Sequence, residues 1–132
     1  MRYADILLCY AETLNETGAT AQAVQLVNNT VRKRAWGGTL PAAETWNSGM
    51  SQTDFRTHIL DERMRELCFE GWRRMDLIRT GKLVDLVKQR NKWTKQSGTI
   101  QPFHNRYPIP LQEIKQNEDI GESDQNPGYS NN

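Results

Sequence analysis

Long apolar runs are missing from this chain. No stretch of it approaches the roughly 18 apolar residues that a membrane-spanning helix needs. The apolar segment DILLCYAE around Cys9 is too short for a secretory leader, and Asp5 interrupts it. Leu8 is also too bulky for the small residue that precedes a processed lipoprotein cysteine. We therefore expect Met1 to open a fragment of a longer protein, and not a natural precursor.

Cysteine is scarce as well. The chain has only two, Cys9 and Cys68, and neither belongs to a CxxC pair or a Cys/His cluster. Both stand among apolar neighbours at helical spacing, which predicts buried structural thiols. A disulfide or a metal-binding pair is the alternative. The cysteine content therefore leaves the redox compartment open.

An excess of charge of one sign is also absent. The 17 Lys and Arg residues nearly balance the 16 Asp and Glu residues, for a net charge of +1. A basic stretch over residues 82–95 is offset by an acidic one over residues 111–132. We expect VRKR and KQRNKWTK to be solvated helix faces, and we expect no nucleic-acid partner and no anionic membrane surface.

Catalytic motifs are missing too, since the chain has no P-loop, no GxSxG and no cysteine with a plausible base nearby. Glu62, Glu66 and Glu70 are spaced so that they can share one helix face. Metal-binding bundles, however, pair Glu with a His three residues later, and no such pair occurs. His58 and Glu62 together would supply only two ligands. We therefore expect no catalytic residue, no metal site and no cofactor. A glycoside hydrolase domain is a distant alternative, because its paired carboxylates have no sequence spacing.

What the chain does have is helical periodicity in its first 35 residues. Gly18 separates two periodic segments, and Thr20 is expected to cap the second. A link this short makes an antiparallel helix hairpin that resembles one tetratricopeptide-type repeat of about 34 residues. Repeat folds need about three such units, which indicates that neighbouring helices are missing. The residues expected on the inner faces are Tyr3, Ile6, Leu7, Tyr10, Leu14, Ala23, Val24, Val27 and Val31.

The remaining chain predicts a glycine-rich loop over residues 36–52, then further helices. Ser51 or Thr53 caps a third helix, Gly71 breaks the pattern, and helical stretches resume over residues 72–81 and 82–92. The prolines after residue 100 predict an extended C-terminal tail laid over the helices. The fold class is therefore mainly α, with a tetratricopeptide-like hairpin, further helices and long irregular loops. Inward positions are expected at Phe55, Ile59, Leu60, Met64, Leu67, Cys68, Trp72, Met75, Leu77, Ile78, Leu83, Leu86 and Val87.

Four tryptophans are many for a chain of 132 residues. We expect Trp72 to lie in the core. Trp36, Trp46 and Trp93 have polar or glycine-rich surroundings, so they either anchor loops or offer an aromatic face to a sugar or a partner. Trp46 and Trp93 are the best candidates for ligand binding.

The stretch ERMRELCFEGWRRMD, residues 62–76, concentrates charge beside aromatic residues. Some of its charges attract at helical spacing, as in Arg63 with Glu66 and in Arg73 with Asp76. Successive glutamates repel, so we expect some of these charges to find partners elsewhere. We predict a charged clasp that holds two helical segments to each other and to the YPIP tail. Glu70 and Arg73 would be partly buried in it, with Phe69 and Trp72 packed inward.

Five blocks of sequence, taken in order, resemble the C-terminal part of the SusD/RagB family. They are RYADILLCYAETLNE, VNNTVRKRA, ILDERMRELCFEGWRRMDLIRTGKL, YPIPLQEI and QNPGY. The resemblance implies a largely helical fold built on tetratricopeptide-like hairpins. It also implies that the matched charges look like the family's scaffold signature: Arg63, Glu66, Glu70, Arg73 and Asp76. Glu118 departs from the pattern, since the family commonly carries proline there.

The same resemblance implies a function. Members of the family are surface-exposed outer-membrane lipoproteins of Bacteroidetes-type bacteria that capture glycans or peptides. They form a lid over a SusC-like TonB-dependent transporter. Residues 1–132 would then be a single C-terminal helical segment, with the lipid anchor and most of the ligand-binding region outside it. We expect a non-catalytic scaffold. The alternative is an isolated helical-repeat module that binds a protein partner through a groove.

Overall fold

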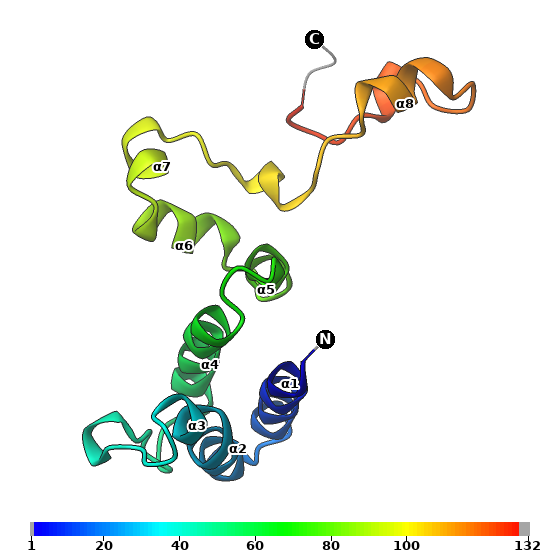
Figure 1. Cartoon of the computed structure of the whole chain (residues 1–132). Helices are drawn as coiled ribbons and strands as arrows, with labels where there is room; N and C mark the ends of the chain where they lie inside the picture. Colours follow the sequence, from blue (N-terminus) through cyan, green and yellow to red (C-terminus); the bar gives the residue numbers. More distant parts are fainter. Residues whose placement is uncertain (1, 130–132) are drawn as a thin grey trace. The chain divides into compact units, whose positions relative to one another are not determined.

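The computed structural model describes residues 2–129, except for the side chains of residues 95–97. It is mainly helical, as predicted, and no strand occurs among the residues it describes (Figure 1). The chain divides into two compact units, Met1–Arg73 and Arg74–Asn132. Each unit has its own buried residues and its own hydrogen bonds.

The first unit begins with the predicted hairpin. Helix α1 (Tyr3–Glu16) turns at Gly18 into α2 (Thr20–Val27), and the two helices pack against each other along their length. Gly18 has φ +87°, a left-handed conformation that a glycine adopts without strain. After α2 the helix continues through a π-helical segment, η1 (Asn28–Arg32), into the short α3 (Lys33–Ala35). A loop with a 3₁₀ turn, η2 (Ala42–Glu44), then leads to α4 (Gln52–Glu66), which packs on both α1 and α2.

The starts of α2 and α4 differ in how they are capped. Ser51 caps α4 as predicted, since its hydroxyl accepts a hydrogen bond from the Asp54 N–H at 3.0 Å. Thr20 does not cap α2. Ala19 occupies the N-cap position, and the Thr20 hydroxyl instead donates to Oδ1 of the buried Asn15 at 2.9 Å. Asn15 thus ties the end of α1 to the start of α2, so Thr20 stabilises the hairpin link and not the helix end.

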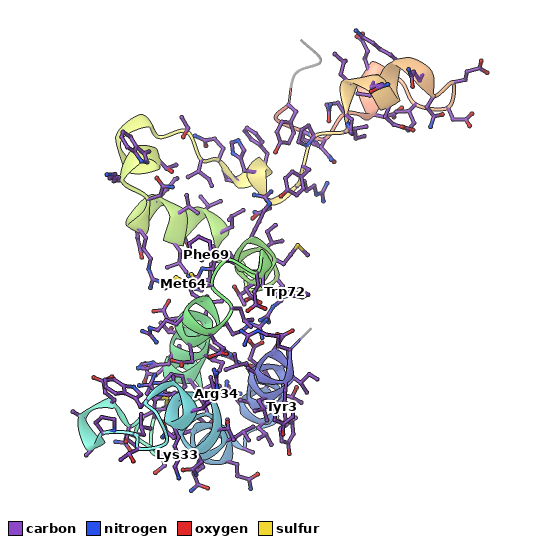
Figure 2. The ribbon with its side chains drawn as sticks, viewed as in Figure 1. Tyr3, Lys33, Arg34, Met64, Phe69 and Trp72 are labelled. Carbon is purple, nitrogen blue, oxygen red and sulfur yellow. The ribbon has the colours of Figure 1, made fainter. Side chains whose placement is uncertain are left out.

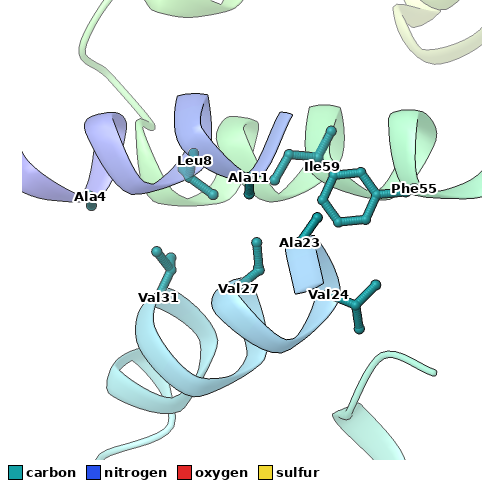
Figure 3. Close-up of a cluster of buried hydrophobic side chains, with 9 residues drawn as sticks. All are labelled: Ala4, Leu8, Ala11, Ala23, Val24, Val27, Val31, Phe55 and Ile59. Atoms are coloured by element: carbon teal, nitrogen blue, oxygen red, sulfur yellow. The ribbon is translucent and has the colours of Figure 1, made fainter. Parts of the chain in front are cut away.

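The core of the first unit is built from small and medium side chains (Figure 3). Alanines on both helices of the hairpin let α1 and α2 approach closely, and Phe55 and Ile59 of α4 close the cluster from the other side. Packing at this density makes each lost methylene costly. The buried members are Ala4, Leu8, Ala11, Ala23, Val24, Val27, Val31, Phe55 and Ile59.

The inner face of α1 is the predicted one only at two of its leucines. Tyr3, Ile6 and Tyr10 are 74%, 51% and 54% exposed, while Leu7 and Leu14 are half-buried against the core. The hairpin buries the side of α1 that carries alanines and Leu8, because close helix contact favours small residues over tyrosine. Helix α1 therefore carries two apolar faces, and the pattern of large side chains combined residues of the solvent face with two leucines that pack on the core.

Both cysteines are exposed, so the predicted burial is wrong. Both are also free thiols, with no disulfide between them. Cys9 lies one position beyond the buried Leu8, on the side of α1 that faces α4. Its Sγ accepts a hydrogen bond from Nη1 of Arg63 at 3.4 Å. Cys68 follows the end of α4, beside the buried Leu67.

The second unit consists of short helices. The helix α5 (Trp72–Arg79) leads into it, and α6 (Leu83–Arg90), α7 (Lys92–Ser97) and α8 (Leu111–Gln116) follow, with 3₁₀ turns η3 (Pro102–Asn105) and η4 (Glu122–Asp124). Helices α5 and α6 lie within the predicted stretches. The residues after Trp93 were predicted to be extended, and this is wrong for α7, α8 and the 3₁₀ turns. Six-residue helices span less than two turns, too few for a hydrophobic period to be seen.

Side-chain hydrogen bonds hold the C-terminal residues against the RYPIP segment. The Gln125 side chain accepts from the Ile109 N–H at 2.8 Å and donates to the Ile109 carbonyl at 3.0 Å. The Tyr129 hydroxyl donates to the Arg106 carbonyl at 2.6 Å. Between them Gly128 takes φ +92°, where a Cβ would overlap the ring of Phe103. The NPGY sequence thus needs glycine for both backbone and space.

Gly128→Ala is expected to destabilise the second unit by about 1–3 kcal/mol, because a left-handed alanine is strained and the added methyl must displace the Phe103 ring. Amide hydrogen exchange at Ile109, whose N–H bonds to Gln125, would report the loss as faster exchange. Gly121→Ala is the matched control, since a Cβ there meets no atom closer than 3.8 Å. Equal exchange rates in the two variants would contradict the prediction.

Candidate functional site

The charged stretch at residues 62–76 makes most of its contacts with other parts of the first unit. Arg63 is the centre of one group. Its Nη2 lies 3.0 Å from Oδ1 of Asp5, and its Nε lies 3.6 Å from Oε1 of Glu12. The side chains of Arg63 and Asp5 are only 3% and 6% exposed. A buried ion pair therefore joins α4 to α1.

Glu62 is the centre of a second group. It accepts from Nη1 of the buried Arg32 at 2.7 Å and from Nη1 of Arg65 at 3.0 Å. Arg32 also donates through Nη2 to the Glu44 carbonyl at 2.6 Å. This group connects α4, η1 and the loop that contains η2.

A third group surrounds the end of α4. Glu66 pairs with Arg2 at 3.0 Å and with Arg34 at 2.5 Å, and Nε of Arg2 donates to Glu70 at 2.8 Å. The hydrogen bonds to Glu70 and Glu66 raise the pKa of the Arg2 guanidinium above its ordinary value. Three carboxylates of the stretch, Glu62, Glu66 and Glu70, thus have partners outside it, which confirms that part of the prediction.

The predicted clasp is present only in part, since Arg73 is half-buried as predicted but Glu70 is exposed, and its remaining contacts are divided between two arginines. In the first unit, Arg73 donates to the Leu60 carbonyl at 2.7 Å and lies 3.8 Å from Asp61, so it joins α5 to α4. In the second unit, Arg74 donates to the His104 carbonyl at 2.8 Å and stacks 4.1 Å from the centre of the Tyr107 ring. Arg74 therefore contacts the tail, and Arg73 holds the helices.

The aromatic residues of the stretch do not pack inward as predicted. Phe69 is fully exposed, at 105%, and Trp72 is also exposed (Figure 2). Helix α4 ends at Glu66, and the turn that follows buries Leu67 and turns Phe69 outward with φ +64°. Cys68 lies in the same turn and is exposed with it. Met64 on α4 and Met75 on α5 were also predicted inward and are exposed too.

Arg73→Ala is expected to lower the free energy of unfolding of the first unit by about 1–3 kcal/mol, because a charged hydrogen bond to the buried Leu60 carbonyl is lost. The sequence alone predicts an equally large loss for Glu70→Gln. The structure reduces that expectation, since the Glu70–Arg2 pair is open to solvent. Thermal unfolding of both variants would measure the difference. A variant that melts like the wild type but loses ligand binding in the parent protein would make this stretch a binding site.

A cleft of about 760 Å³ lies beside the second charged group. It opens between the outer side of α4 and the loop around η2, and two of the three candidate tryptophans line it. Its wall combines aromatic, acidic, basic and amide side chains. A cleft of this size and mixed lining is large enough for a small polar ligand. The residues that line it include Arg32, Trp36, Glu44, Trp46, Asn47, Met50, His58, Asp61, Glu62 and Arg65.

The two tryptophans of the cleft differ. Trp46 is half-buried and packs edge-on against Phe55, with ring centres 5.9 Å apart. The guanidinium of Arg32 lies 4.9 Å from the centre of its ring, so one face is occupied by the protein itself. Trp36 is half exposed on the same cleft. Trp93 belongs to the second unit, where it is exposed on α7 with Nζ of Lys92 4.9 Å from its ring centre.

Sequence reasoning missed the buried charges Asp5 and Arg32. Both stand inside apolar patterns, Asp5 between Ala4 and Ile6 and Arg32 directly after Val31. A charge in such a position signals a buried partner, because an unpaired buried charge is very costly. The signal was therefore available, although it does not name the partner.

The part of the chain that the structure describes contains no group of three or more His, Cys, Asp or Glu side chains placed to hold a metal ion. His58, once considered with Glu62, has its Nδ1 2.8 Å from the Asp54 carbonyl. Over the same described residues, no helix combines the length and the apolar character needed to cross a bilayer.

Comparisons with known proteins place the chain in one family. The sequence model of the SusD family matches residues 1–129. SusD-like protein P25 of Formosa agariphila is 44% identical over 133 residues, covering 97% of the chain and 24% of that protein. SusD-like protein P38 of the same organism is 38% identical over 120 residues, or 88% of the chain and 23% of that protein. The starch-binding protein SusD of Bacteroides thetaiotaomicron is 32% identical over 83 residues, or 59% of the chain and 14% of that protein. The chain thus spans about a quarter of the length of the first two relatives, and no solved structure is significantly similar to it.

Proposed function

This chain belongs to the SusD family, and from that premise we propose that it is the helical scaffold segment of a non-catalytic, nutrient-binding lipoprotein. The parent protein lies on the surface of the outer membrane, held by a lipid anchor outside this segment. It captures a glycan or a peptide and works with a SusC-like TonB-dependent transporter. Most of the ligand-binding surface also lies outside these residues, and no cofactor takes part.

One observation carries the scaffold role: the charged residues of the family-like blocks are engaged in holding helices together. Arg63 pairs with Asp5, Glu66 and Glu70 pair with Arg2, and Arg73 binds α4. Asp76, the fifth, is buried and pairs within its own helix, 2.8 Å from Nη2 of Arg79, so this pair stabilises α5 and does not join it to another helix. Residues already occupied in this way are poorly placed to contact a ligand or to act as acid and base.

A binding experiment tests the proposal. We expect the 132-residue chain alone to bind glycans weakly or not at all, because a cation already lies over one face of each candidate ring, Arg32 over Trp46 and Lys92 over Trp93. Maltoheptaose is a suitable probe, since one relative is named a starch-binding protein. Stacking of a sugar on an indole would quench tryptophan fluorescence. Saturable quenching that is lost in Trp46→Ala or Trp93→Ala would contradict the proposal.

The exposed apolar side chains of the first unit favour a second candidate, a helical-repeat module that binds a protein partner. Tyr3, Tyr10 and Phe69 are each exposed, and exposed aromatic side chains are of the kind that such a partner covers. The sequence of the gene upstream of residue 1 separates the two candidates. A signal peptide ending in a lipidated cysteine, followed by several hundred residues, supports the lipoprotein. A complete protein that begins at Met1 supports the interaction module.

A further inference from the structure

We infer that the exposed apolar stripe of α1 is the docking surface for another helix of the parent polypeptide. The inference rests on the proposal that this chain is a segment of a longer protein. The stripe consists of Tyr3, Ile6 and Tyr10, which are the most exposed apolar residues of α1. Their spacing of three and four residues places them on one side of the helix. A straight stripe of large apolar side chains fits a helix laid alongside α1.

The other sides of α1 are already occupied. Its alanines and Leu8 pack against α2 (Figure 3). Its acidic side, with Asp5 and Glu12, faces Arg63 of α4. The stripe therefore lies on the remaining side of the helix, apart from both neighbours that the first unit supplies.

A hollow of about 420 Å³ adjoins the stripe at the start of α1. Its walls come from α1 on one side and from η1 and α3 on the other, and they are mainly apolar. A large apolar side chain of an incoming helix can enter this hollow while its neighbours cover Tyr3. The residues that line it are Arg2, Tyr3, Ala4, Leu7, Thr30, Val31 and Arg34.

The order of the helices indicates what the occupant is. The hairpin of α1 and α2 is followed by α4, which packs on both of its helices as the first helix of a next repeat would. If the repeat before α1 packs on the hairpin in the same way, it lies on the side of α1 away from α4. A single repeat cannot bury its apolar faces, so a neighbour on that side is required. The relatives supply the length, because the chain covers only 24% of SusD-like protein P25.

The experiment compares the 132-residue chain with the longer protein encoded by its gene. Hydroxyl-radical footprinting should modify Tyr3 and Tyr10 several-fold more slowly in the parent protein, purified without any partner, than in the isolated chain. Trp36, which opens on the cleft and not on the stripe, serves as the internal control and should react alike in both. Equal rates for the tyrosines in the two proteins would overturn the inference.

A pair of variants tests the same surface by stability. The double variant Tyr3→Ser with Tyr10→Ser should lower the Tm of the parent protein by several degrees and leave the Tm of the isolated chain nearly unchanged. Gln25→Ala, an exposed substitution on α2, should change neither. If the double variant melts like Gln25→Ala in the parent protein, the stripe is not covered there.

Other occupants would give other results, each of which overturns the inference. A second copy of the chain would produce a dimer of the isolated chain in sedimentation, with the tyrosines protected in it. An external protein would protect the tyrosines only when the membrane transporter is added to the parent protein. A gene without upstream residues would remove the proposed function as well, whereas reactive tyrosines in a longer parent protein would remove the docking surface alone.

Discussion

Arg63→Ala is expected to destabilise the first unit by about 3–5 kcal/mol, because it leaves the carboxylate of Asp5 buried without its cation. For a unit of this size such a loss lowers the Tm by more than about 10 °C. Two further contacts are lost, to Glu12 and to Sγ of Cys9, and all three lie on the same side of α1. The variant therefore weakens the attachment of α4 to the hairpin. Circular dichroism during heating would measure the change.

The pair between Glu16 and Arg56 is the matched control. It also joins α1 to α4, with Nη2 of Arg56 2.6 Å from Oε2 of Glu16, but both side chains are about half exposed. Arg56→Ala should therefore change the Tm far less than Arg63→Ala does. The hydrogen bond from Arg56 lowers the pKa of the Glu16 carboxyl. The stability that this pair contributes is therefore fully present above the ordinary carboxyl pKa, and it is lost as the pH falls through the lowered pKa. Equal Tm changes for the two arginine variants would show that burial does not decide the strength of these pairs.

Phe55→Ala is expected to cost the first unit about 3–5 kcal/mol, the range for removing a buried aromatic ring and leaving a cavity. Phe55 is completely buried and contacts the core from α4. Its ring also supports Trp46 edge-on, so the loop around η2 should loosen in the variant. We expect the Tm to fall and the tryptophan emission to move to longer wavelength as Trp46 becomes hydrated.

Thr57→Ala provides the comparison for this second variant, because it changes an exposed residue on the same helix. It should leave both the Tm and the emission maximum close to those of the wild type. Phe55→Leu should fall between the two, since it keeps part of the apolar volume. An unchanged emission maximum in Phe55→Ala, with a lowered Tm, would mean that Trp46 is held by Arg32 and its other neighbours without Phe55.

The helices of the first unit could be predicted from the sequence, but not the faces that they bury. The spacing of apolar residues predicted α1, α2 and α4. Gly18 marks the turn between α1 and α2, and Ser51 marks the start of α4. The inner face of α1 was wrong because Tyr3 and Ala4 are both apolar, and only the contact between helices selects the smaller one. The π-helical segment Asn28–Arg32 was also missed, because its sequence has no breaker.

The partners of the charges lay beyond the reach of sequence reasoning. The pairs Arg63–Asp5 and Arg2–Glu70 join residues separated by more than fifty positions, and spacing within a helix carries no information about them. Local rules could predict that the charges of residues 62–76 need outside partners, since like charges repel along a helix. They could not predict which aromatic side chains become exposed at the turn after Glu66. That turn depends on the tertiary contacts of Leu67 and Arg73.

Two features of Phe69 destabilise the first unit. Its backbone is left-handed, at φ +64°, which costs an ordinary residue about 1–2 kcal/mol, and its ring is fully in water. For the stability of these residues taken alone, glycine or asparagine would be the better choice at this position. Replacing Phe69 with glycine or asparagine should therefore stabilise these residues, an outcome opposite to that expected for a core aromatic residue.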